Sequence, residues 1–168
     1  MGAFGDGIRQ LRRRGFADAL EEEVRQKGKP LLGICLGLQL LARVGYEQGE
    51  LPGLGWIAGR VVRLESPPEP AALRIPHIGW NDVSLTRTSE LFAGLRMPAS
   101  FYFAHSYALV PDDWAVVSGV CEYGQAVVAS LEAGNLYATQ FHPEKSHRAG
   151  LAVLKNFVRI ATACGVPC

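Results

Sequence analysis

The stretch Leu31-Leu32-Gly33-Ile34-Cys35-Leu36-Gly37-Leu38-Gln39 decides how this 168-residue chain is expected to fold. Its first four residues form a short, continuous apolar run, which is typical of a strand buried on both faces in a parallel sheet. Helical spacing resumes directly after Cys35, with Leu36, Gln39, Leu40 and Val44. A buried strand that leads straight into a helix predicts an α/β fold, with Cys35 at the junction.

The junction reads Gly-x-Cys-x-Gly over residues 33–37, which is the pattern of a nucleophile elbow when it lies between a strand and a helix. Such a turn is tight and strained, so small residues flank the nucleophile. The N–H groups of the following helix favour the thiolate of Cys35, and the N–H of Leu36 can face a developing oxyanion. The alternative is a buried structural cysteine between two packing glycines, and the spacing alone does not decide between them.

A thiol nucleophile needs a base, and the base needs a partner that fixes its tautomer. Gln140-Phe141-His142-Pro143-Glu144 follows a predicted strand, so His142 and Glu144 can both reach the edge of a sheet. His142 is the candidate base, and Glu144 the candidate residue that orients it. Alone, this pattern favours a loop histidine and a surface glutamate. Together with the elbow, it indicates a catalytic Cys-His-Glu triad.

Composition narrows the class of protein. The chain carries 17 Lys and Arg against 16 Asp and Glu, so its charge suggests no nucleic acid and no membrane surface as partner. No apolar run approaches the length of a membrane span, and residues 1–15 show no secretory signal. The cysteines at 35, 121, 164 and 168 have neither CxxC spacing nor metal-ligand spacing. We therefore expect a cytoplasmic protein of a reducing compartment, without a metal.

The length predicts one domain over residues 1–168. Periodicity predicts helices at both ends, with Asp6 capping the first and Gly28 ending the second, and a β-rich insertion between them. The expected helices are a short one with Ile8 and Leu11, one over 16–27 and one over 147–163. The expected strands are 31–34, 55–64, 82–85, 101–109, 114–121, 126–131 and 136–141.

Residues 33–39 and 140–146 together resemble the class I, or triad-type, glutamine amidotransferases. The stretches Ile-Pro-His-Ile-Gly-Trp-Asn at 75–81 and Tyr-Phe-Ala-His-Ser-Tyr at 102–107, with residues 2–6, are similar to the glutaminase subunits of imidazole glycerol phosphate synthase. This resemblance covers essentially the whole chain. It implies a flavodoxin-like three-layer fold with a mixed sheet and an antiparallel β insertion.

The resemblance also implies a reaction and a partner. Glutamine is hydrolysed to glutamate and ammonia, and no cofactor is needed. The ammonia passes to a (βα)₈-barrel cyclase subunit, which makes imidazole glycerol phosphate and aminoimidazole carboxamide ribotide in histidine biosynthesis. Two alternatives stay open: a glutaminase subunit that serves another acceptor, and a non-catalytic subunit that only docks to the cyclase.

Single positions take roles from the same resemblance. Leu36, Met1 and Gly2 would form the oxyanion site, while Trp80 and Lys145 would face the cyclase. The residues that would contact glutamine are Gly37, Gln39, Glu47, Ser106 and Tyr107. Plain structural readings exist for several of them: Gln39 as helix surface, Trp80 as core and Lys145 as a solvated charge. His77 and His105 are interpreted as structural residues.

Family members carry further elements ahead of the Gly-Ala-Phe-Gly segment, which stands here at residues 2–5. We therefore expect the N-terminal strands of the fold to be missing from this sequence. The buried strand 31–34 supports the same expectation, because a strand of this type usually pairs with a parallel strand on each edge. The sequence offers only 136–141 as a second convincing strand of that type.

Overall fold

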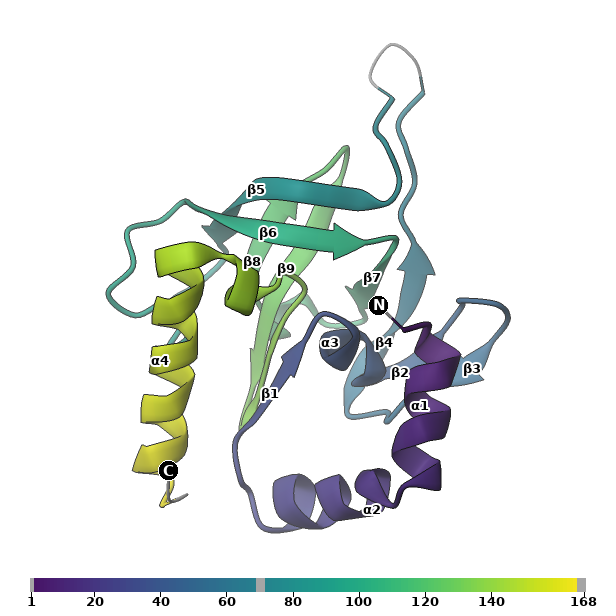
Figure 1. Ribbon diagram of the computed structural model, residues 1–168, viewed down its shortest axis with the longest axis vertical. Coiled ribbons are helices and arrows are strands. Elements are labelled where there is room, and N and C mark those ends of the chain that lie inside the picture. Colours follow the sequence, from purple (N-terminus) through teal and green to yellow (C-terminus); the bar gives the residue numbers. More distant parts are fainter. Residues whose placement is uncertain (1, 69–71, 166–168) are drawn as a thin grey trace.

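A computed structural model describes residues 2–68 and 72–165 of the chain, and their strands form two sheets (Figure 1). The six-stranded sheet has the order β1-β10-β9-β8-β5-β6. Its strands are β1 (Leu31–Ile34), β5 (His77–Leu85), β6 (Ala99–His105), β8 (Val117–Glu122), β9 (Ala126–Ala133) and β10 (Leu136–Thr139). The four-stranded sheet has the order β3-β2-β4-β7. Its strands are β2 (Ala42–Gly45), β3 (Leu51–Pro52), β4 (Ile57–Arg63) and β7 (Tyr107–Pro111).

Helices lie on both faces of the larger sheet (Figure 1). On β10, Leu136 and Ala138 pack with the helices of the N-terminal part, whereas Tyr137 faces the opposite cluster with the C-terminal helix. No helix within 2–68 and 72–165 is long and apolar enough to cross a membrane. The helices are α1 (Phe4–Arg13), α2 (Phe16–Leu20), the π-helix η1 (Glu21–Gln26), α3 (Leu36–Leu40), the 3₁₀ turns η2 (Trp114–Val116) and η3 (Pro143–Lys145), and α4 (His147–Ala163).

The apolar run at the start of the elbow forms β1 as expected. It pairs in parallel with β10, so that Gly33 lies opposite Ala138 and Ile34 opposite Thr139. The other pairs of the six-stranded sheet are antiparallel. Because the carboxyl ends of parallel strands meet at one edge, the residues that follow β1 and β10 lie at the same edge.

Helix α3 is shorter than the sequence predicts. Helical spacing continued to Val44, yet α3 ends at Leu40 and Val44 lies in β2. Backbone N–H groups of the following loop and of β4 donate to the carbonyl oxygens of Leu40, Leu41 and Ala42 at 2.9–3.1 Å. These tertiary hydrogen bonds take the carbonyl groups that further helical turns would need.

The predicted strand 101–109 is also wrong as a single element. It breaks at Ser106 into β6, which pairs with β5, and β7, which pairs with β4 in the other sheet. The chain thus changes sheets at Ser106. Another correction concerns Asp6, which lies inside α1 and forms an ion pair with Arg9 instead of capping the helix. The N–H of Phe4 donates to Glu47 Oε2 at 2.6 Å instead.

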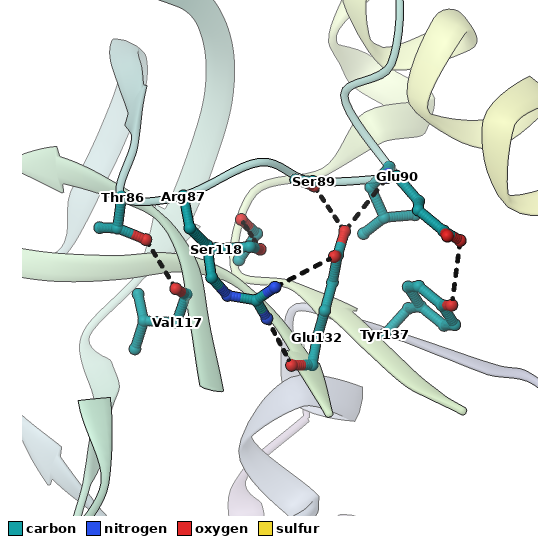
Figure 2. Close-up of polar contacts among 10 residues, drawn as sticks. Thr86, Arg87, Ser89, Glu90, Val117, Ser118, Glu132 and Tyr137 are labelled. Atoms are coloured by element: carbon teal, nitrogen blue, oxygen red, sulfur yellow. Dashed lines mark hydrogen bonds and ion pairs between the residues drawn. The ribbon is translucent and has the colours of Figure 1, made fainter. Parts of the chain in front are cut away.

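Side-chain hydrogen bonds join the connection between β5 and β6 to the sheet, and two of them end on the carboxylate of Glu132. Figure 2 shows Glu132, at the end of β9, reaching across to this connection. Its Oε1 accepts hydrogen bonds from the hydroxyl of Ser89 and from the N–H of Leu91, and Arg87 lies 3.8 Å from its other oxygen. The hydroxyl of Tyr137 also donates to Glu90 at 3.4 Å. The long β5–β6 connection is therefore fixed by charge-assisted hydrogen bonds.

Candidate active site

Cys35 stands on a sharp turn between β1 and α3. Its backbone has φ 52° and ψ −103°, a region that side-chain-bearing residues rarely adopt. A residue in such a backbone conformation destabilises the folded state by on the order of 1–3 kcal/mol, and the conformation persists only where the surrounding structure fixes it. Here the N–H of Cys35 donates to the carbonyl oxygen of Thr139 at 2.7 Å. A Cβ at Gly33 would lie 2.9 Å from the backbone carbonyl group of Gly37, so the turn needs glycine at that position.

His142 and Glu144 follow β10 at the same sheet edge. The N–H of His142 donates to the carbonyl oxygen of Tyr102 at 2.8 Å, and its own carbonyl oxygen accepts from the hydroxyl of Ser146. His142 Nδ1 lies 2.7 Å from Glu144 Oε1. A carboxylate can only accept, so Nδ1 carries the proton, and Nε2 is left as a proton acceptor. Nε2 is buried and has no hydrogen-bond partner among the described residues.

The pKa of the Cys35 thiol is raised, chiefly because the side chain is buried. The backbone N–H of Leu36 and the side chain of Gln140 oppose this shift, while the charge of Glu144 adds to it. The expectation that the helix would favour the thiolate is thus outweighed by burial, and α3 has only five residues. A thiol in this environment depends on a base to remove its proton.

A pocket of about 350 Å³ lies beside Cys35 and brings most of the expected site residues together. This volume is at the lower end of the range for small-molecule sites. Gly37, His142 and Glu144 are not among its lining residues, and Met1 lies outside the described residues. The expected residues that line it are Gly2, Cys35, Leu36, Gln39, Glu47, Ser106 and Tyr107.

Gln39 does not lie on the helix surface. Its side chain is buried, and its Nε2 donates to the carbonyl oxygen of Tyr107 at 2.8 Å and to Gln140 Oε1 at 3.1 Å. Gln140 is also buried, and its Nε2 donates to Cys35 Sγ at 3.7 Å. Gln140 stands two residues before the candidate base, but its position in the sequence alone indicates no role for it.

His77 and His105 form a buried pair that the sequence reasoning also missed. His77 Nδ1 lies 3.1 Å from His105 Nε2, and the ring of His77 stacks on Tyr123. Burial lowers the pKa of both imidazoles to about 4, aided by His105 in the case of His77 and by His142 in the case of His105. His105 lines the pocket, so the pair belongs to the site.

Trp80 is half exposed and is not a core residue. It lies opposite Tyr102 on the neighbouring strand and stacks on the ring of His147, with ring centroids 4.9 Å apart. Lys145 Nζ lies 5.9 Å from the centre of the Tyr102 ring. Ile78, two residues before Trp80 on β5, is 60% exposed. We call Ile78, Trp80, Tyr102, Lys145 and His147 the aromatic face.

Comparison with known proteins gives one family. The sequence model of the class-I glutamine amidotransferases matches residues 5–161. The imidazole glycerol phosphate synthase subunit HisH of Moorella thermoacetica is 46% identical over 165 residues, which cover 98% of this chain and 76% of that protein. The HisH subunit of a Synechococcus species is 48% identical and shares 97% of this chain and 73% of its own length.

Solved structures agree with the fold. A glutamine amidotransferase from Thermotoga maritima superposes with a TM-score of 0.61 at 21% identity, covering 99% of this chain and 62% of that one. A second crystal structure of a glutamine amidotransferase gives a TM-score of 0.64 at 22% identity, covering 96% of this chain and 76% of that one. These likenesses confirm the expected α/β fold with a mixed sheet.

Proposed function

This chain belongs to the class-I glutamine amidotransferase family, and on that premise we propose that it is the glutaminase subunit of an imidazole glycerol phosphate synthase. It hydrolyses glutamine to glutamate and ammonia, and the ammonia passes to a cyclase subunit. The observation that carries the chemistry is the strained Cys35 at the same sheet edge as the His142–Glu144 pair. The HisH relatives support the histidine-pathway partner.

In this proposal His142 Nε2 takes the proton of Cys35, and the sulfur attacks the carboxamide carbon of glutamine. The N–H of Leu36 donates to the oxyanion that develops there. When the tetrahedral intermediate collapses, His142 returns the proton to the leaving nitrogen, which departs as ammonia. Water, deprotonated by His142, then cleaves the thioester to glutamate and restores the thiol. Glu144 fixes the tautomer throughout and stabilises the imidazolium.

The pocket supports the expected contacts to glutamine. Glu47 is assigned to its amino group, and the backbone of Ser106 and Tyr107 to its carboxylate. Gly2 would lie near the oxyanion. Glu47 also accepts the N–H of Phe4, so the carboxylate is already oriented by the start of α1. The assignments of Gln39 and Gly37 stay predictions.

The aromatic face is assigned to the cyclase. It presents half-exposed Trp80 and exposed Ile78 beside the cation of Lys145, and exposed aromatic residues are enriched where proteins bind one another. A subunit that only docks would not need a nucleophile in a strained backbone conformation, so the elbow geometry favours catalysis over docking alone.

The test is glutamate release by this chain mixed with a barrel cyclase and the cyclase's ribulosyl carboxamide nucleotide. Cys35→Ala should lower the rate on the order of 10⁴-fold or more, because the nucleophile is lost. Cys164→Ala, which removes an exposed thiol, should keep the rate of the wild type. An undiminished rate in Cys35→Ala would contradict the proposal. Equal rates with and without the cyclase would favour another acceptor.

A further inference from the structure

We propose that Gln140 is a further catalytic residue, whose side-chain amide donates a hydrogen bond to the sulfur of Cys35 and stabilises the thiolate. The inference rests on the proposed function, since it concerns the same nucleophile. Gln140 directly follows β10, its side chain is fully buried, and its Nε2 lies 3.7 Å from Cys35 Sγ. That distance suits an N–H···S bond, because sulfur is larger than oxygen.

The orientation of the Gln140 amide follows from its neighbours by elimination. The carbonyl oxygen of Tyr107 can only accept, so the atom of Gln39 that lies 2.8 Å from it must be the NH₂ group. The same NH₂ group lies 3.1 Å from the Gln140 amide, so Gln140 must present its oxygen there. The nitrogen of Gln140 is then the atom that faces the sulfur. A donor in this position favours the thiolate over the thiol.

The Tyr107 carbonyl is fixed from its other side by the histidine pair. His105 Nδ1 lies 2.8 Å from this oxygen and must therefore donate, which leaves His105 Nε2 to accept from His77 Nδ1. Asn81 Nδ2 donates to the remaining nitrogen of His77 at 3.4 Å. Every bond in this chain is satisfied with both imidazoles neutral, as their lowered pKa values of about 4 require at neutral pH.

One continuous chain of hydrogen bonds therefore runs from β5 through the Tyr107 carbonyl to the nucleophile. The Tyr107 carbonyl oxygen accepts two hydrogen bonds, one from His105 and one from Gln39. A flipped Gln39 amide would place its own oxygen against this carbonyl oxygen, so the orientation with the NH₂ group toward Tyr107 is fixed. Gln39 and His105 are positioning residues in this account: they act on Cys35 only through Gln140. A buried amide without such partners would lose free energy and orientation.

The experiment measures alkylation of Cys35 by iodoacetamide as a function of pH, with the Cys35 peptide quantified by mass spectrometry. Because the thiolate is the reacting form, loss of the Gln140 donor should slow alkylation about tenfold at pH 7 in Gln140→Leu. Gln140→Glu places a carboxylate oxygen against the sulfur and should slow it further. Gln39→Leu should fall between the wild type and Gln140→Leu, because the amide is kept but loses its orientation.

Two controls separate this effect from a general loss of packing. Ser118→Ala removes another buried hydrogen bond, to Ser130, and should leave Cys35 alkylation unchanged. The exposed Cys164 in the same samples should react at the wild-type rate in every variant. If Gln140→Leu does not fold, judged by circular dichroism, Gln140→Glu takes its place. An alkylation profile equal to that of the wild type in a folded Gln140 variant would overturn the inference.

Alkylation needs neither glutamine nor a cyclase, so the two proposals fail separately. A wild-type chain that released no glutamate, but whose Cys35 lost reactivity in the Gln140 variants, would overturn the proposed function and support the hydrogen bond. A chain that released glutamate, but whose Cys35 reactivity did not depend on Gln140, would support the proposed function and overturn the hydrogen bond.

Discussion

Cys35 combines a strained backbone turn with a buried thiol. The backbone of Cys35 has a positive φ, which forms the sharp turn between β1 and α3. Gly33 has no side chain, so the backbone of Gly37 can approach it closely. The thiol is nevertheless buried, which raises its pKa and leaves it dependent on the groups that touch it. Three groups therefore favour removal of the proton from the Cys35 thiol: the N–H of Leu36, the amide of Gln140 and the base His142.

The histidine pair makes a prediction about pH. Both imidazoles have a pKa of about 4 in the folded chain against 6.5 for an unperturbed histidine, so between these values the unfolded chain binds more protons. Their contribution to stability is therefore full above pH 6.5 and is lost as the pH falls toward 4. The free energy of unfolding, measured by urea titration at several pH values, should decline across this window.

The double variant His77→Gln, His105→Asn removes both titrating groups and keeps amides that can donate and accept. Its free energy of unfolding should vary less with pH between 6.5 and 4 than that of the wild type. Carboxylates also titrate in the acid part of this pH range. The contribution of the histidine pair is therefore the difference between the wild type and the double variant in how the free energy of unfolding depends on pH. Equal slopes would show that the pair does not stay neutral through folding.

The elbow could be read from the sequence because its constraint is local: Gly33 meets Gly37 within the same short motif. His142 and Glu144 were equally readable, since their hydrogen bond joins residues two positions apart. The pairing of His77 with His105 depends instead on the register of β5 against β6, which no spacing along the chain reveals. The same holds for Gln39, whose partners, Tyr107 in β7 and Gln140 after β10, are distant in the sequence.

Among the elements, β1 matched the prediction from its continuous apolar run, and α4 matched the prediction from its single helical periodicity. The run 101–109 did not, because it contains neither Gly nor Pro to mark the change of sheet at Ser106. The end of α3 was missed for a related reason: the bonds that replace its next turn come from a loop and a strand more than ten residues further along. Tertiary pairing decides such boundaries, and propensity does not.

The β5–β6 connection gives the prediction at this scale. Glu132→Ala removes the carboxylate that accepts from Ser89 and Leu91, and leaves those donors without their partner. We expect the free energy of unfolding to fall by about 2 kcal/mol, because the acceptor is charged and its side chain is only 10% exposed. Exposed Glu122→Ala, at the end of β8, should change it by no more than about 0.5 kcal/mol. Similar losses in both variants, by chemical denaturation, would contradict this account.

For the molecule as a whole, the site and the aromatic face share β5 and β6. On these strands His105 lines the pocket and His77 contacts His105, while Trp80 and Tyr102 lie on the aromatic face. Ile78 belongs to both, because it lines the pocket and is 60% exposed. A partner that covers the aromatic face would therefore lie directly beside the mouth of the pocket.

Trp80→Ala should weaken binding of the cyclase about 30-fold, which corresponds to about 2 kcal/mol, the size of a hot-spot aromatic residue. Trp114→Ala is the matched control, because both tryptophans are 49% exposed and Trp114 lies in η2, outside the aromatic face. Isothermal titration calorimetry with the cyclase measures both. The assignment fails if Trp80→Ala binds as the wild type does, or if Trp114→Ala is weakened as much.

The central claim is that Cys35 is the nucleophile that attacks glutamine. Incubation with 6-diazo-5-oxo-L-norleucine, a glutamine analogue that alkylates nucleophiles in glutamine sites, followed by mass spectrometry of the digested chain, tests it most directly. The account predicts one adduct per chain, on the peptide that contains Cys35, and protection by excess glutamine. An adduct on another cysteine, or labelling of Cys35 that glutamine does not slow, would contradict it.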